Sequence, residues 1–249
     1  MNEHAGPPHV DAPDDWPELG SGVSDRAVAQ ALEALTGESH AGAVRRLVGY
    51  YSVEGNYAGA SFATLAPVEP QTITATDLHA TSLLSVKVGP GATRRLLGSS
   101  PERDRALAVL AQLPEIDLAN AEAETLRLME EFYRWAKSAL SSPAAKSSNP
   151  WVTASKVCAR KRPRLFPVRD RNVSTLLGIL QLDDFRMDWL VFRELVRSPA
   201  VTKELALLPR RVQEAAGERA VVIDESPLRL LDAALWTHTG RTRACLPYA

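Results

Sequence analysis

Signals that begin α-helices recur along most of this chain and limit its fold more than any other feature. Helix caps or first-turn prolines precede apolar repeats at five places, which are Thr74 or Thr76, Pro101, Asp170, Ser198 with Pro199, and Ser226. Segments with such starts and apolar residues at helical spacing fold as amphipathic helices. Phe185, Trp189, Phe192 and Val196 show this spacing and give one helix an aromatic face. We therefore predict a mainly α, multi-helix globular domain.

The chain has 249 residues, of which 45% are hydrophobic, and this is enough for one large core. Residues 1–22 are rich in Pro, Asp and Gly, so we expect a flexible leader, with the first helix running from about Ser24 to Thr36. Residues 23–249 then form a single helical domain. The Ser, Pro and Asn stretch at 141–150 either joins two lobes of that domain or forms a surface loop.

Residues 47–65, "LVGYYSVEGNYAGASFATL", alternate glycine and aromatic residues without a helical stripe. This pattern favours strand or irregular structure. We predict at most a short β hairpin or an extended crossing here.

Several classes of function are not indicated. No run of residues is apolar and long enough to span a membrane, and the N-terminus lacks the features of a signal peptide, so we expect a cytoplasmic protein. Cys158 and Cys245 are expected to be free thiols. No nucleotide-binding, hydrolase or metal motif is visible, so we expect no cofactor and no metal site. The oligomeric state does not follow from the sequence.

The segment 153–173, "TASKVCARKRPRLFPVRDRNV", concentrates seven basic residues around one acid, Asp170, in a chain of net charge −1. The seven are Lys156, Arg160, Lys161, Arg162, Arg164, Arg169 and Arg171. Lys156 and Arg160 lie one turn apart if the segment is helical, so the charge gathers at one edge. Any affinity for nucleic acid or phosphate must come from a local patch such as this one, because the whole chain has no charge bias.

Three interpretations of the basic segment compete. In the first, Asp170 caps the next helix and nearby acids such as Asp183, Asp184 and Asp188 pair with the arginines. In the second, the basic residues contact the phosphates of a nucleic acid. In the third, they hold a small phosphorylated or carboxylated ligand in a pocket, with Asp170 as a base or an orienting group.

Three blocks of sequence resemble an uncharacterised bacterial family of unknown function. They are "ITATDLHATSLLSV", "ASKVCARKRPRLFPVRDRNV" and "SPLRLLDAALW", and the resemblance covers roughly residues 45–240. It implies a shared fold and no particular activity.

A more distant resemblance is to the helix-hairpin-helix DNA glycosylase superfamily. It is carried by a lysine-bearing helix followed by "FPVRDRNV" at a helix start. The resemblance implies that Asp170 is the catalytic carboxylate and that Lys156 occupies the lysine position after the hairpin. The segment "SSNPWVTASK" has no glycine for the hairpin turn of that superfamily, so we expect kinship of fold without glycosylase activity.

Further candidates support or compete with this site. Arg229 and Asp232 can pair on one helix face, or Asp232 can orient the segment from Arg164 to Arg171. Asp77 and His79 form a D-x-H pair, but on a helix they point to different sides.

Aromatic side chains offer stacking surfaces as an alternative to core packing. They are Trp151, at the start of the basic helix, and Tyr50, Tyr51 and Tyr57.

We expect the basic segment to bind nucleic acid, most naturally DNA, with Asp170 as an altered catalytic acid. The alternatives are an enzyme or sensor for a small anionic ligand, and a structural or interaction protein in which internal acids pair with the arginines.

Overall fold

The structure of this protein is a computed structural model, and it describes residues 12–141 and 150–240. Within these residues there are twelve α-helices and no strands. The chain is therefore mainly α, as the helix signals predict. None of the described helices combines the length and the apolar composition that crossing a membrane requires.

The helices follow one another with short connections. Before the gap at 142–149 they are α1 (Ser21–Thr36), α2 (Ala41–Tyr51), α3 (Gly59–Phe62), α4 (Ala75–Ser82), α5 (Pro90–Leu97), α6 (Pro101–Gln112) and α7 (Ala123–Leu140). After it they are α8 (Trp151–Lys161), α9 (Arg171–Leu177), α10 (Phe185–Arg197), α11 (Pro199–Ala216) and α12 (Pro227–His238). Two short 3-10 turns lie at Leu118–Asn120 and Leu180–Leu182.

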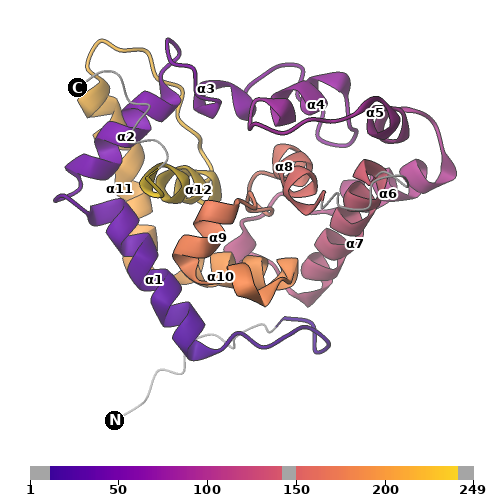
Figure 1. The fold of residues 1–249 in the computed structure, drawn as a ribbon, viewed down its shortest axis with the longest axis horizontal. Coiled ribbons are helices and arrows are strands. Elements are labelled where there is room, and N and C mark those ends of the chain that lie inside the picture. Colours follow the sequence, from indigo (N-terminus) through magenta and orange to yellow (C-terminus); the bar gives the residue numbers. More distant parts are fainter. Residues whose placement is uncertain (1–11, 142–149, 241–249) are drawn as a thin grey trace.

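The helices form two groups that meet around α9 and α10. Helices α1 and α2 pack against α11 and α12, so segments from the two ends of the described chain lie side by side (Figure 1). In the second group α7 packs against α5, α6 and α8, and α4 packs against α8. Helix α10 contacts α1 and α11 and faces the turn before α7, which places the segment between α8 and α9 at the junction of the groups.

Aromatic side chains fill the centre of this junction. Tyr133 of α7 stacks on Phe166, with ring centroids 6.4 Å apart, and meets Trp189 of α10 edge-on at 5.2 Å. Phe166 also meets Trp189 edge-on at 5.5 Å. Each of these rings is at most 2% exposed, and one continuous apolar cluster includes residues of both groups. The aromatic stripe predicted for residues 185–196 thus faces the core.

Local capping explains where several helices begin. Thr74 and Asp77 form a capping box at the start of α4. Asp170 caps α9 by accepting hydrogen bonds from the backbone N–H groups of Asn172 and Val173. Helix α9 ends at Gly178, whose φ of 76° lies in the left-handed region that favours glycine.

Residues 47–65 form no hairpin in the described chain, within the expectation of at most a short one, and part of this stretch is helical. Its first part belongs to α2 and its last part contains α3, and the one bridge nearby joins Ser52 to Val221. Gly59 allows α3 to approach α2 closely, because a Cβ atom at this position would lie 2.4 Å from the carbonyl oxygen of Tyr50. The glycine therefore serves helix contact and not a turn between strands.

Residues 12–20 differ from the free leader expected for 1–22. Trp16 is buried, its ring lies 5.8 Å from that of Trp189, and its Nε1 donates a hydrogen bond to Glu130 over 2.9 Å. Helix α1 begins at Ser21, three residues before the predicted start. Residues 1–11 and most of the predicted linker at 141–150 lie outside the described residues.

Candidate functional site

The helix that carries the basic segment, α8, is enclosed by its neighbours. It packs against α7 and α4, and all its residues from Ala154 to Lys161 are buried. Lys156 is 6% exposed, and Arg160, Lys161 and Arg162 are each 3% exposed. The positive charge of these four residues therefore lies inside the protein and not along an exposed edge.

Asp77 of α4 neutralises part of this charge. Its Oδ1 accepts a hydrogen bond from Arg160 Nε over 3.1 Å, and its Oδ2 accepts one from Lys161 Nζ over 2.7 Å. All three side chains in these pairs are fully buried. Burial lowers the pKa of Lys161, and the hydrogen bond and charge of Asp77 oppose that change.

Backbone carbonyl groups take up the remaining donors of this cluster. Arg160 donates to the carbonyl oxygens of Phe62 and Leu65, and Lys161 donates to that of Glu69. Arg162 donates to the carbonyl oxygens of Pro70 at 2.6 Å, Leu110 at 2.6 Å and Leu113 at 3.3 Å. These three residues therefore fasten the segment between α3 and α4 to α8.

Arg164 is exposed but paired. Its Nε and Nη2 donate to the two carboxylate oxygens of Asp117 over 2.9 and 2.8 Å. This bidentate geometry is typical of pairs between a guanidinium group and a carboxylate. Arg164 is thus engaged within the protein as the structure stands.

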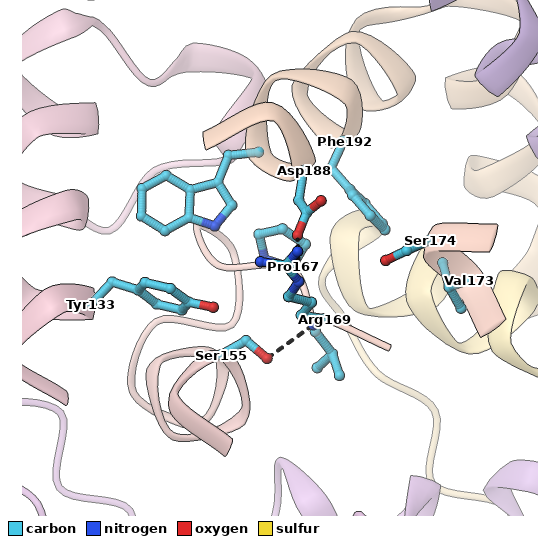
Figure 2. Close-up of a pocket in the computed structure, with 10 residues that line it drawn as sticks. Tyr133, Ser155, Pro167, Arg169, Val173, Ser174, Asp188 and Phe192 are labelled. Atoms are coloured by element: carbon cyan, nitrogen blue, oxygen red, sulfur yellow. Dashed lines mark hydrogen bonds and ion pairs between the residues drawn. The ribbon is translucent and has the colours of Figure 1, made fainter. Parts of the chain in front are cut away.

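Arg169 points into the interior beside Asp188, as Figure 2 shows. Its Nε lies 3.1 Å from Asp188 Oδ2, and its backbone N–H donates to Ser155 Oγ. The ion pair is poorly aligned, because neither oxygen of Asp188 accepts a hydrogen bond within the described chain. Burial raises the pKa of Asp188 to about 7 although Arg169 opposes this. The cavity of about 10 Å³ beside the pair has room for about one water molecule.

The ring of Trp151 is used inside the protein. It stacks on Tyr133 with centroids 5.2 Å apart and planes 11° apart, and Lys137 Nζ lies 5.1 Å from its centroid. These contacts are packing contacts within the protein. Packing was one of the two roles that the sequence allowed for Trp151, the other being stacking on a ligand.

Arg229 and Asp232 of α12 hold the segment that joins α8 to α9. Arg229 pairs with Asp232 and donates to the carbonyl oxygens of Pro163 and Phe166. Asp232 Oδ2 accepts a hydrogen bond from the backbone N–H of Val168 over 3.1 Å. Asp232 therefore orients this segment, and burial raises its pKa to about 6 against the effect of Arg229.

A cavity of about 530 Å³ lies between the two helix groups. It is lined by residues from α2, α3, α8, α9 and α12 and from the turn after α4. Its polar and aromatic lining comprises Tyr50, Asn56, Tyr57, Phe62, Ser85, Lys156, Asp170, Arg171, Asn172, Asp224, Arg229, Asp232 and Trp236. Its size suits a small molecule.

Lys156 and Arg171 differ from the other basic residues at this cavity. Lys156 Nζ donates one hydrogen bond, to the carbonyl oxygen of Leu84 at 2.7 Å, and makes no ion pair with any described residue. Burial lowers its pKa, and the charge of Asp170 opposes this change. Arg171 is exposed, and its guanidinium group has no hydrogen-bond or ion-pair partner in the part of the chain that the structure describes.

Three aspartates line the cavity, and in each of them one carboxylate oxygen accepts a hydrogen bond. Asp170 Oδ1 accepts from the N–H groups of Asn172 and Val173 at 2.8 and 3.3 Å. Asp224 Oδ2 accepts from the hydroxyl of Tyr51 at 3.0 Å, and Asp232 Oδ2 is held as described above. The second oxygen of each has no hydrogen-bond partner among residues 12–141 and 150–240. Burial also raises the pKa of Asp224.

Three rings form what we call the aromatic corner of the cavity: Tyr50, Tyr57 and Trp236. Their centroids lie 5.7 to 6.1 Å apart. The planes are tilted by 39° to 75°, so no two rings are parallel.

The structure brings together only part of the predicted site. Of the proposed residues, Lys156, Asp170, Arg171, Arg229 and Asp232 line the cavity, and the others lie elsewhere. Sequence reasoning missed Asp224 and Trp236, although "SPLRLLDAALW" stood out as a block. The spacing of apolar residues in this block predicted only a helix with one face packed in the core.

The D-x-H pair does not form a site. Asp77 is fully buried among the basic residues, and His79 follows it on the exposed side of α4. Among residues 12–141 and 150–240 there is no group of three His, Cys, Asp or Glu side chains that could hold a metal ion.

Comparison with known proteins yields one finding. No curated protein and no solved structure matches this chain. A family model matches residues 43–239, a stretch that contains the helices α3 to α12 and every residue of the cavity. The chain belongs to this family, DUF6308, a family of unknown function.

Proposed function

We propose that this protein binds a small molecule with a phosphate or carboxylate group in the cavity between its two helix groups. Lys156 and Arg171 contact the anionic group. The observation that carries the proposal is Lys156, a buried ammonium group that lines a cavity of about 530 Å³ with no ion-pair partner among the described residues.

The neighbouring Lys161 shows how unusual this arrangement is. Lys161 is also buried and lies just over one helical turn after Lys156 on α8. Its charge is balanced by Asp77, whose Oδ2 lies 2.7 Å from Lys161 Nζ. Burying an ammonium group without a partner costs several kcal/mol, so buried charges are ordinarily paired. Lys156 has two further N–H donors that no described residue accepts. An anion in the cavity would supply both the charge and the acceptors.

A structural role for Lys156 is the competing explanation. Its hydrogen bond to Leu84 holds the turn after α4, where Ser85 adopts a left-handed φ of 61°. A turn of this kind is held by its surroundings. However, one hydrogen bond from an ammonium group contributes about 1.5 to 3 kcal/mol, which is less than the cost of several kcal/mol for burying a charge without an ion-pair partner.

The test is titration with inorganic phosphate, methyl phosphate and acetate, followed by thermal unfolding and by tryptophan fluorescence. Trp236 lines the cavity and reports locally, so the fluorescence change should disappear in Trp236→Phe. We expect at least one of the three anions to raise the melting temperature, as mass action requires for a ligand of the folded state. Lys156→Met and Arg171→Ala should each weaken this effect.

Arg94→Ala is the matched control, because Arg94 is an exposed arginine of α5 outside the cavity. It should leave the effect of the anion unchanged. The proposal is refuted if none of the anions acts at millimolar concentration, or if Lys156→Met and Arg171→Ala respond like the wild type.

Asp170 is the residue we propose for any chemical step on the bound molecule. One of its oxygens caps α9 and the other is open to the cavity, so its carboxylate is fixed in place beside the cations. Asp170→Asn should preserve the cap and anion binding while abolishing turnover of any substrate that is found. Loss of binding together with turnover would instead assign it a positioning role.

Nucleic-acid binding is the second proposal. It is supported by Arg171, whose side chain is exposed at the cavity and can reach a phosphate outside it. Four of the seven basic residues are buried, which leaves few cations for phosphate contacts. Fluorescence anisotropy of labelled DNA and RNA across a salt series tests it. Salt-dependent binding that Arg171→Ala weakens would support it, and no binding at low salt would refute it.

A further inference from the structure

The geometry points to a zwitterion as the ligand: a molecule whose phosphate or carboxylate meets Lys156 and Arg171 and whose ammonium group meets the aromatic corner and Asp224. This inference rests on the proposed function, since it adds a second recognised group to the same ligand. It is carried by the placement of Lys156 on α8, in one helix group, and of Asp224 and the aromatic corner beside α2 and α12, in the other.

The aromatic corner favours a compact cation over a flat ring. A planar base or ring stacks best on a parallel surface, and the three rings here are tilted by at least 39° to one another. Rings that are tilted to one another can instead each contact a compact ammonium group with part of one face. Tyrosine and tryptophan rings attract such cations, and quaternary ammonium ligands are recognised in this way.

Asp224 supplies a negative charge at the same end of the cavity. The hydroxyl of Tyr51 holds one of its oxygens at 3.0 Å. The other has no hydrogen-bond partner among the described residues, and Asp224 takes part in no ion pair within that part of the chain. The ring centroids of Tyr51 and Tyr50 lie 5.0 Å apart, so the carboxylate that Tyr51 holds is close to the aromatic corner. Its charge helps to raise the pKa of Tyr50, after the larger effect of burial.

The cationic end is distinct. Lys156 belongs to α8 and donates to Leu84, in the helix group opposite to Tyr50 and Trp236 of the aromatic corner. Arg171 begins α9 directly after Asp170, whose charge opposes the lowering of the Lys156 pKa by burial. Arg229 pairs with Asp232, and its charge also opposes the rise in the pKa of Asp224 that burial causes. An ammonium group at one end and an anion at the other would therefore each meet an opposite charge.

Three pairs of probes test the inference by isothermal titration calorimetry. Phosphoethanolamine is compared with ethyl phosphate, phosphocholine with 3,3-dimethylbutyl phosphate, and γ-aminobutyrate with butyrate. Within a pair the anionic group is the same, and the two molecules differ only in the presence of the ammonium group. We expect at least one zwitterion to bind about 10-fold more tightly than its matched anion, the gain expected from a desolvated cation on aromatic rings.

Asp224→Asn should remove this preference and leave the affinity for the matched anion unchanged, because the amide oxygen can still accept the hydrogen bond from Tyr51. Glu225→Gln is the control, since it changes the same charge at the adjacent residue outside this cavity. Equal affinity within all three pairs overturns the inference and leaves the proposed function standing. A preference that survives in Asp224→Asn and in Trp236→Phe also overturns it. Absence of binding by every anion and zwitterion overturns both.

Discussion

Removing the carboxylate of Asp77 should destabilise this protein more than changing any exposed ion pair. Asp77 is fully buried, pairs with Arg160 at 3.1 Å and Lys161 at 2.7 Å, and completes the capping box of α4. Breaking a buried ion pair from one side costs about 3 to 5 kcal/mol. Loss of a helix cap adds about 1 kcal/mol. We expect Asp77→Ala to lower the free energy of unfolding by about 4 to 6 kcal/mol.

Urea denaturation followed by far-UV circular dichroism measures this change. Thr74→Ala removes only the capping side chain and should cost about 1 kcal/mol, which separates the cap from the ion pairs. Asp117→Ala removes the partner of the exposed Arg164 and should cost less than about 1 kcal/mol. A cost for Asp77→Ala as small as that for Asp117→Ala would refute the reasoning, because the two cations would then not depend on Asp77.

Other predictions concern single side chains. Lys156→Met should leave the stability of the ligand-free protein unchanged or raised, whereas Arg160→Met should lower it by roughly 3 kcal/mol because Asp77 loses a partner; urea midpoints of both variants check this. Burial raises the pKa of Asp188 to about 7, above its value of about 4 in unfolded chains, so its contribution to stability falls as pH rises from 4 to 7. Asp188→Asn should therefore gain stability relative to the wild type across this window, as urea midpoints at several pH values would show. Trp16→Ala should cost about 3 kcal/mol or more by leaving a cavity, which thermal unfolding would reveal.

Most helices could be predicted because their signals are local. Caps and prolines at Thr74, Pro101, Asp170 and Ser226 stand next to the helices that they start. The pattern of segment 47–65 did not reveal that it contains parts of two helices, because glycine next to aromatic residues has two explanations. Sequence pattern cannot tell a glycine that turns a strand from one, such as Gly59, that lets two helices touch.

The partners of the basic segment could not be predicted, because they are distant in sequence. Arg160 and Asp77 are 83 residues apart, and Arg162 reaches carbonyl groups up to 92 residues away. Carbonyl oxygens carry no sequence signal at all. The pairing of Arg169 with Asp188 agrees with the interpretation that nearby acids meet the arginines, since α9 and α10 follow closely.

Some residues of the cavity could be identified from the local sequence, and others could not. Asp170 and Arg171 were identified because they belong to one dense cluster of charge. Asp224 and Trp236 come from the other end of the chain and reach the cavity only because α12 packs against α2. Their roles depend on that tertiary contact and not on their neighbours in sequence.

The way α8 holds residues 62–70 has a consequence for how this family can vary. The anchor points on that segment are carbonyl oxygens, at Phe62, Leu65, Glu69 and Pro70, and every amino acid provides one. Substitutions at its exposed positions should be accepted freely, unlike those at Phe62, which is buried and lines the cavity, while an inserted or deleted residue would move each oxygen out of reach of its donor. Among members of the family, this stretch should therefore be conserved in length, and its exposed positions should be free in composition.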